Sequence, residues 1–188
     1  MKRIVLSEVG YSLLDINDDG QSELLISVLE DAKSGFIYDM YTIISGEIIH
    51  IACSGERYRH YLAEDHSINF EGSDGADTSY YENDSIDNTY GTLKINLAVI
   101  YDAWIDRENP WFYTTADYYN DKTGNRDYGV LQSISEDKAT MLLDTFPENI
   151  PLDLIPFSDL AYSIDKIAAI TRGEKVSCEL AENENGAE

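Results

Sequence analysis

The sequence predicts an α+β fold, in which a mostly antiparallel β-meander is followed by two helices near the C-terminus. Runs rich in β-branched and aromatic residues recur about every ten residues between positions 9 and 117, with Gly, Asn and Asp in the gaps. Helical spacing of apolar residues begins only near position 133. Because strands at such short intervals pair most economically with their chain neighbours, we expect a meander with the helices segregated behind it.

The predicted strands begin with Val9–Leu14 and Glu23–Leu29, which flank a short polar loop. Ser45-Gly46 is a turn signal between two later strands. The remaining strands are expected at Phe36–Ile44, Glu47–Ala52, Tyr58–Ala63, Ser67–Phe70, Thr78–Glu82 and Thr92–Trp104.

Two helices are expected after the strands. Ser133-Ile-Ser-Glu136 has the capping-box pattern, Ser135 is an equally good N-cap, and Pro147 ends the helix. The apolar face of this helix consists of Ala139, Met141, Leu142, Leu143 and Phe146. A second helix is predicted from about Asp159, with a C-terminal cap at Gly173.

The chain is strongly acidic, with 36 Asp and Glu residues against 13 Lys and Arg, which gives a net charge of −23. Between Arg59 and Lys94 it carries acids and no Lys or Arg. This charge argues against nucleic acid or an anionic membrane as a partner. The acidic stretch is interpreted as a solvated face, with a basic partner or cation binding as alternatives. No apolar run is long enough for a transmembrane helix.

One segment has the pattern of a calcium site. Calcium prefers six to eight oxygen ligands, and a loop can supply them from alternate positions. Gly20 lies where such a loop turns sharply, and Asp18 points outward by parity. The predicted ligands are Asp15, Asn17, Asp19, the backbone carbonyl of Gln21, and Glu23.

This loop is EF-hand-like without being a full EF-hand. The twelfth position is Ile26, where an EF-hand has a bidentate Glu, and the flanking residues favour strands over helices. The shorter loop closed by Glu23 is the type found in integrin-like β-propeller repeats. The alternative is an ordinary Asp/Asn/Gly turn. Bound calcium would neutralise clustered charge and hold the first hairpin, whereas catalytic use would need an open coordination position.

Several segments around this loop carry a family resemblance. They are Leu13–Ile26, Ile37–Thr42, Ser45–Ile48, Ser54–Leu62, Asn69–Ala76, Ile134–Asp137 and Ile155–Leu160. In this order they resemble a family of uncharacterised secreted proteins and lipoproteins of Gram-positive, often gut, bacteria. The resemblance covers about residues 10–160 and implies an extracellular or cell-envelope β-rich domain with bound calcium, but no activity.

The chain departs from the family pattern in two places. Asp18 replaces a usually small residue in the loop, and the segment Met1–Leu6 is too short to be the apolar region of a signal peptide. Because millimolar calcium outside cells would fill even a weak loop, compartment and calcium occupancy are linked. We expect one calcium-binding domain over residues 1–173 and an acidic, loosely ordered tail over residues 174–188.

Histidine and cysteine patterns point to no further chemistry. His50, His60 and His66 do not have metal-ligand spacing, and His50 is interpreted as a partnered strand residue. A thiol nucleophile made of Cys53 and His50 is disfavoured, because residues at this spacing in a strand face opposite sides. Cys53 is interpreted as a small core residue, and its pairing with Cys178 is left open, with two separate thiols favoured.

The remaining acids and aromatics allow two interpretations each. Asp102, Asp106 and Glu108 are solvated turn acids or, less favoured, paired carboxylates. The aromatic groups are strand residues with one wet end or an exposed platform for sugar or protein contacts. These groups are Tyr80-Tyr81, Trp111-Phe112-Tyr113 and Tyr118-Tyr119.

The leading functional hypothesis is a non-catalytic, calcium-stabilised, extracytoplasmic domain that binds a protein or glycan. The alternative is an acidic inhibitor or immunity-type protein that mimics nucleic acid and binds a basic partner, for which the net charge of −23 is the main argument. A hydrolase with scattered carboxylates ranks last. The sequence does not indicate the oligomeric state.

Overall fold

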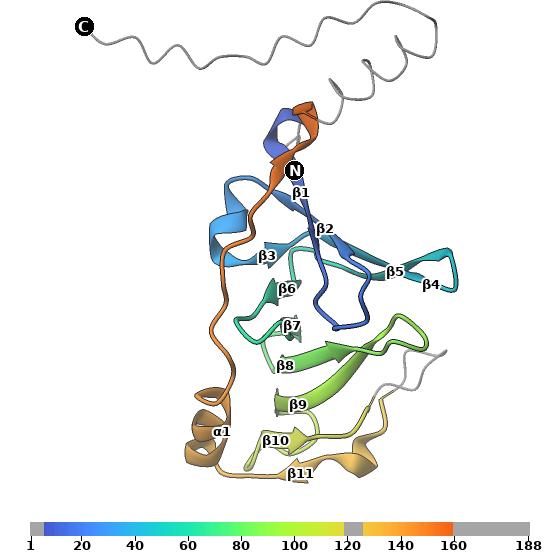
Figure 1. The fold of residues 1–188 in the computed structure, drawn as a ribbon. Coiled ribbons are helices and arrows are strands. Elements are labelled where there is room, and N and C mark those ends of the chain that lie inside the picture. Colours follow the sequence, from blue (N-terminus) through green and yellow to red (C-terminus); the bar gives the residue numbers. More distant parts are fainter. Residues whose placement is uncertain (1–5, 119–125, 160–188) are drawn as a thin grey trace, which may run out of the picture.

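The computed structural model of the protein describes residues 6–118 and 126–159. It contains two antiparallel β-sheets, which lie one above the other in Figure 1, with a helix and a long returning segment along one side. Most neighbouring strands are also consecutive in the chain. The predicted α+β fold with a mostly antiparallel meander is therefore confirmed.

The first sheet has five strands and contains the hairpin of the predicted calcium loop. Its members are β1 (Val9–Leu14), β2 (Glu23–Val28), β4 (Asp39–Ile44), β5 (Glu47–Cys53) and β12 (Ile155–Pro156), in the order β12-β1-β2-β4-β5. Leu14 pairs with Glu23 at the end of the β1–β2 hairpin, so the intervening residues project as a loop.

The second sheet has seven strands and forms most of the meander. They are β3 (Phe36–Ile37), β6 (Tyr58–Leu62), β7 (Ile68–Gly75), β8 (Thr78–Ile86), β9 (Leu93–Asp102), β10 (Trp111–Thr114) and β11 (Gln132–Ser133), in the order β11-β10-β9-β8-β7-β6-β3. Strands β7 and β8 run further than the predicted segments Ser67–Phe70 and Thr78–Glu82, and polar side chains pair across the two strands. Asn83 Nδ2, for example, donates to Asn69 Oδ1 at 2.9 Å.

The chain passes from one sheet to the other at Tyr38. The backbone N–H of Tyr38 donates to the carbonyl of Ile26, and the carbonyl of Tyr38 accepts from the N–H of Ser54, both at 2.8 Å. The single strand predicted over Phe36–Ile44 is therefore two strands, β3 and β4, that belong to different sheets.

One α-helix, α1 (Glu136–Leu143), follows the strands as predicted. Ser135 is its N-cap and accepts from the N–H of Lys138 at 3.3 Å. Of the expected apolar face, Ala139 is buried whereas Met141 is 61% exposed. Residues 157–159 are helical, close to where the second helix is predicted to begin, at about Asp159. The rest of that predicted helix and the tail over residues 174–188 lie outside the described residues. Three short 3-10 helices complete the described structure: Leu6–Glu8, Asp31–Ser34 and Tyr128–Val130.

Residues 144–156, which we name the return segment, run from α1 back past both sheets (Figure 1). The N–H of Ile150 donates to the carbonyl of Leu62 at 2.9 Å, and the N–H of Leu152 donates to the carbonyl of Ala32 at 2.8 Å. The segment ends in β12, where Pro156 pairs with Gly10 of β1. The return segment therefore joins the two sheets.

The buried apolar side chains form two clusters. One contains Leu25, Ile37, Met40, Leu62 and Ile68, and the other contains Phe70, Tyr80, Ile95, Ile100 and Tyr118. Strands β7, β8 and β9 contribute to both clusters. Among the described residues, no helix has the length and apolar character needed to cross a membrane.

Candidate functional site

The predicted calcium loop connects β1 to β2, and its side chains fold inward onto its own backbone. The two carboxylate oxygens of Asp15 accept from the N–H groups of Asp19 at 3.2 Å and Gly20 at 3.0 Å. Asn17 Oδ1 accepts from the N–H of Asp19 at 3.2 Å, and Asp19 Oδ1 accepts from the N–H of Gln21 at 2.8 Å. The alternate positions singled out by the sequence thus face the interior of the loop.

Two residues give the loop its tight turn. Gly20 has a φ of 86° and Asp18 a φ of 57°, both in the left-handed region that Gly, Asn and Asp adopt most readily. The side chain of Asp18 is exposed. Its outward direction agrees with the parity argument and leaves the interior of the loop to its neighbours.

Glu23 is the last residue of the predicted loop and the first residue of β2, and its side chain is completely buried, with 0% exposure. Its Oε2 accepts from the N–H of Ile16 at 3.0 Å, and its Oε1 accepts from Thr42 Oγ1 at 2.9 Å and Asn17 Nδ2 at 3.3 Å. Burial raises the pKa of Glu23 above its ordinary value, and the nearby loop carboxylates add to this effect, against the opposing hydrogen bonds. The loop therefore concentrates negative charge around a desolvated carboxyl group.

The loop also contacts the second sheet. Asn88 Nδ2, in the turn between β8 and β9, donates to the backbone carbonyl of Asn17 at 3.3 Å. In the same turn, a Cβ added to Gly91 would lie 2.9 Å from Thr42 Cγ2, so only glycine allows this approach. The conformation of the loop is thus coupled to the relative placement of the sheets.

The donor set of the loop fits calcium by its chemistry, since carboxylate, amide and carbonyl oxygens are the ligands that this hard cation prefers. Within residues 6–118 and 126–159, however, no three or more His, Cys, Asp or Glu side chains gather in a way that could hold a metal ion. The loop oxygens accept backbone hydrogen bonds instead. Calcium would draw Asp15, Asn17, Asp19 and Glu23 toward a common centre, together with the carbonyl of Gln21.

His50 and Cys53 both belong to β5. His50 Nε2 lies 2.7 Å from Asp39 Oδ1, as expected for a partnered strand residue. Cys53 is exposed, so its interpretation as a core residue is wrong. The reason is that β5 is the outer strand of its sheet, where apolar side chains such as Ile48, 74% exposed, face solvent. Cys178 lies outside the described residues.

Two of the three candidate paired carboxylates, Asp102 and Asp106, accept hydrogen bonds from backbone N–H groups in the turns that follow them. Asp102 Oδ1 accepts from the N–H groups of Trp104 at 2.9 Å and Ile105 at 3.3 Å, and Asp106 Oδ1 accepts from the N–H of Glu108 at 2.9 Å. Asp102 is only 3% exposed, so its description as solvated is wrong. Its buried oxygen is matched to backbone donors that no pattern in the sequence identifies.

The predicted aromatic groups are mainly structural. Tyr80 and Tyr118 are each 1% exposed and Phe112 is 7% exposed, because all three belong to the second apolar cluster. For these side chains the exposed-platform interpretation is wrong, and the strand interpretation of Tyr80 and Phe112 holds. Tyr119 lies outside the described residues.

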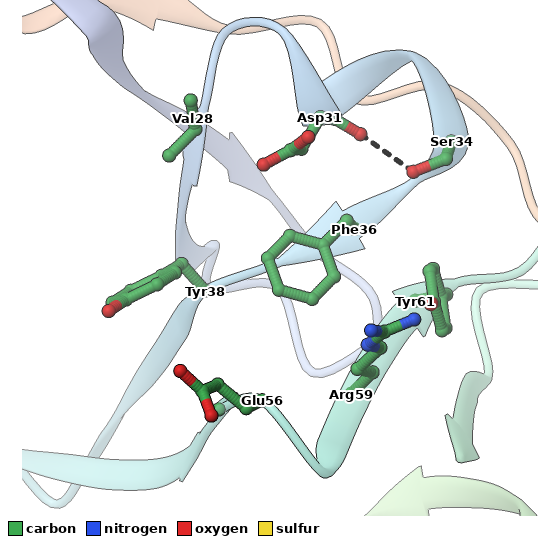
Figure 2. A pocket seen from close by; sticks show the side chains of 9 residues that line it. Val28, Asp31, Ser34, Phe36, Tyr38, Glu56, Arg59 and Tyr61 are labelled. Carbon is green, nitrogen blue, oxygen red and sulfur yellow. Dashed lines mark hydrogen bonds between the residues drawn. The ribbon is translucent and has the colours of Figure 1, made fainter. Parts of the chain in front are cut away.

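An aromatic pocket lies instead at the junction of the two sheets, beside Tyr38. Its volume is about 630 Å³, within the range of ligand-binding pockets. Figure 2 shows the ring of Phe36 at its centre, Tyr38 to one side and Tyr61 to the other. The Phe36 ring centroid lies 6.4 Å from that of Tyr38 and 5.8 Å from that of Tyr61, both with edge-on geometry. We name this site the Phe36 pocket.

Polar groups surround these rings. Asp31, Glu56 and Arg59 line the pocket, and Figure 2 shows Arg59 between Phe36 and Tyr61. Burial is the main cause that raises the pKa of the Tyr61 phenol, which keeps this hydroxyl group protonated and able to donate. The pocket therefore offers apolar ring surface together with acceptors and donors.

Sequence reasoning missed this pocket because it depends on strand register. Phe36 and Tyr38 share one side of an extended segment by their spacing of two. Tyr61 joins them only because it pairs with Phe36 across β3 and β6. Both segments lie within predicted strands, Phe36–Ile44 and Tyr58–Ala63, but no local pattern indicates that they pair with each other.

No protein-family model, curated protein or solved structure matches this chain.

Proposed function

We propose that the protein is a non-catalytic, calcium-stabilised binding domain that acts in the cell envelope or outside the cell and holds a glycan in the Phe36 pocket. The observation that carries this proposal is the coexistence of three aromatic rings and three charged side chains around one pocket of about 630 Å³. Two further pockets in the described part of the chain are smaller, at about 220 and 250 Å³.

The lining matches the two sides of a sugar ring. The faces of Phe36, Tyr38 and Tyr61 offer flat apolar surface for its C–H groups. The carboxylates of Asp31 and Glu56 can accept hydrogen bonds from sugar hydroxyl groups, and the Arg59 guanidinium can donate to them. A protein segment with an aromatic anchor is the other ligand class considered, and the lining of acceptors and donors favours the glycan.

The loop supports the calcium part of the proposal. Its oxygen donors fit calcium, and its buried Glu23 carboxyl raises the benefit of a compensating cation. Extracellular modules typically bind calcium with Kd values of about 10⁻⁴–10⁻³ M, so a site that must first rearrange its oxygens suits a calcium-rich compartment. The resemblance to secreted proteins and lipoproteins supports the same location.

A second candidate function is an acidic inhibitor that binds a basic protein. It is favoured by the net charge of −23 and by the absence of Lys and Arg between Arg59 and Lys94. A complex of this kind would form rapidly at low salt and weaken steeply as salt screens the charges.

The test of the glycan proposal is binding to an array of bacterial and plant oligosaccharides in millimolar calcium, followed by calorimetry with the retained sugar. We expect the wild type to retain at least one glycan and Tyr38→Ala to bind it roughly tenfold more weakly, since a stacked ring contributes about 1–1.5 kcal/mol. The control is Tyr90→Ala, because Tyr90 is 72% exposed and lies outside the pocket. Retention of no glycan, or equal affinity of Tyr38→Ala, would contradict the proposal.

A further inference from the structure

A smaller cavity, of about 220 Å³, lies against the face of the second sheet that carries both apolar clusters. It shares no lining residue with the Phe36 pocket and none with the calcium loop. Its lining mixes apolar and acidic side chains: His60, Phe70, Ile95, Glu82, Asp84 and Asp117. We name it the Asp84 cavity.

Strand alternation places acids on this inward face. Glu82 and Asp84 are two positions apart in β8 and therefore point to the same side. Across the sheet, Asp84 pairs with Ile68 of β7 on one side and Ile95 of β9 on the other. A carboxyl group thus lies between two buried isoleucines, and the expectation of a solvated acidic face is wrong at this point.

One carboxylate oxygen of Asp84 lacks a hydrogen-bond donor in the described part of the chain. Asp84 is 2% exposed, and its Oδ1 is buried without a hydrogen-bond partner among the described residues. Burial raises the pKa of Asp84 well above its ordinary value, and the charges of Glu82 and Asp117 raise it further. Because an unpaired carboxylate is costly to bury, this oxygen calls for a donor that the described residues do not supply.

The nearby histidine does not supply that donor as a cation. His60 is 7% exposed, and burial lowers its pKa to about 4, so its ring is neutral at pH 7. Its Nδ1 already lies 3.1 Å from Ser54 Oγ. The ring stands 5.0 Å from that of Phe70, so the two form an aromatic wall.

We propose that the Asp84 cavity binds a cationic amine or guanidinium group, whose N–H groups donate to the free Oδ1 of Asp84. The charge of such a group offsets the buried carboxylate, and the aromatic wall of Phe70 and His60 favours a cation at its face. The volume is below that of a typical drug-sized pocket but admits an ammonium or guanidinium group on a short chain.

The surroundings favour such a ligand over a bare metal ion. No three acidic, histidine or cysteine side chains of the described residues gather closely enough to hold a metal. Asp117 lines the cavity and is exposed, so solvent reaches the acidic end. The net charge of −23 raises the concentration of cations near the surface. The group can belong to a free small amine or to a Lys or Arg side chain of a partner.

The test is an NMR titration with methylguanidinium chloride and n-butylammonium chloride. Tetramethylammonium chloride at equal ionic strength is the control, since this cation has no N–H to donate. Gly-Arg-Gly and Gly-Lys-Gly, compared with Gly-Gly-Gly, form the second arm. We expect saturable shifts of the Asp84 and Ile95 amides with at least one N–H-bearing probe. Response to the free amines alone identifies a small-molecule ligand, and preference for the peptides identifies a partner side chain.

Three variants that each replace an aspartate by asparagine make the test specific. Asp84→Asn is expected to weaken binding roughly tenfold or more, because it removes the charged acceptor, while it raises the melting temperature of the free protein at pH 7. Asp77→Asn removes the same charge from an exposed position and is expected to bind like the wild type. Asp117→Asn is the second variant within the cavity, with a smaller expected loss. Shifts no larger than with tetramethylammonium, or equal binding by Asp84→Asn and the wild type, would overturn the proposal.

This experiment is independent of the glycan proposal. It uses no sugar and no calcium, and its variants lie outside the Phe36 pocket and the loop. Loss of amine binding therefore leaves glycan binding unaffected, and the reverse also holds.

Discussion

Thr42 Oγ1 donates a hydrogen bond of 2.9 Å to Glu23 Oε1, and both side chains are buried, at 2% and 0% exposure. Thr42 belongs to β4, and Glu23 begins β2. The hydroxyl group therefore satisfies an oxygen of the loop-closing carboxyl group from the neighbouring strand. This contact connects the predicted calcium loop to the body of the first sheet.

Thr42→Val should destabilise the protein by about 1–3 kcal/mol, because it leaves a buried acceptor without its donor. The matched variant Thr42→Ser keeps the hydroxyl group and loses the methyl group that packs at Gly91. Urea unfolding of both variants separates the two contributions. A smaller loss for Thr42→Val than for Thr42→Ser would show that the methyl contact, and not the hydrogen bond, holds this position.

Calcium should raise the melting temperature of the wild type over that in EDTA, and Glu23→Gln should remove most of this increase. The reason is that the substitution takes away a ligand carboxylate while keeping the shape of the side chain. Asp18→Asn is the control, since it removes the same charge from an exposed position and tolerates the φ of 57°.

Calorimetric scans at several calcium concentrations give the comparison. Equal melting temperatures in calcium and EDTA for the wild type would identify the loop as an ordinary turn. If calcium raised the melting temperatures of Asp18→Asn and Glu23→Gln by the same amount, the increase would depend only on the overall charge of the protein.

His60 should make the protein sensitive to acid. Burial lowers its pKa to about 4 from 6.5, so the unfolded chain binds more protons between these values. Its contribution is present above pH 6.5 and is lost as the pH falls through this window, by up to about 3 kcal/mol. The raised pKa of Asp84 has the opposite sign, since that contribution is lost as the pH rises.

The comparison with His60→Asn at each pH cancels the contribution of Asp84. Urea unfolding at pH 7, 5.5 and 4 measures the free energy of unfolding of both proteins. As the pH falls, the wild type should lose stability relative to His60→Asn. An NMR titration of the His60 ring with a midpoint near 6.5 would contradict the expectation.

Gly35→Ala should be more destabilising than Gly46→Ala. Both glycines have positive φ, 79° and 85°, so both variants carry a backbone strain of about 1–2 kcal/mol. A Cβ at Gly35 would in addition lie 2.5 Å from the carbonyl oxygen of Ile150, whereas one at Gly46 would meet nothing within 4 Å. The difference in melting temperature between the two variants measures the cost of the steric contact with the return segment. Equal decreases in melting temperature would show that the return segment moves aside without a measurable cost.

The hairpin of the predicted calcium loop was predictable because its signals are local. Runs rich in apolar residues mark β1 and β2, and the polar residues between them contain the glycine that the turn requires. The N-cap at Ser135 was predictable for the same reason. Each of these signals lies within a few residues of the feature it marks.

Features that depend on distant pairing were not predictable. Pro156 pairs with Gly10 across most of the chain, and β12 is too short to show a periodic pattern. The Phe36 pocket needs the register of β3 against β6. No local sequence pattern distinguishes Asp84 from an exposed acid such as Asp77, and its position between Ile68 and Ile95 makes it a buried carboxyl group.

The return segment has a consequence for synthesis of the chain. Strands β6 to β10 can pair in the order in which they leave the ribosome, since each lies beside its predecessor. Strand β1 emerges first but receives its outer partner only when residues 155 and 156 arrive. Until then its outer edge is open to pairing with other chains. Rapid translation of the last third of the chain, or a chaperone that covers β1, would therefore protect the newborn protein from aggregation.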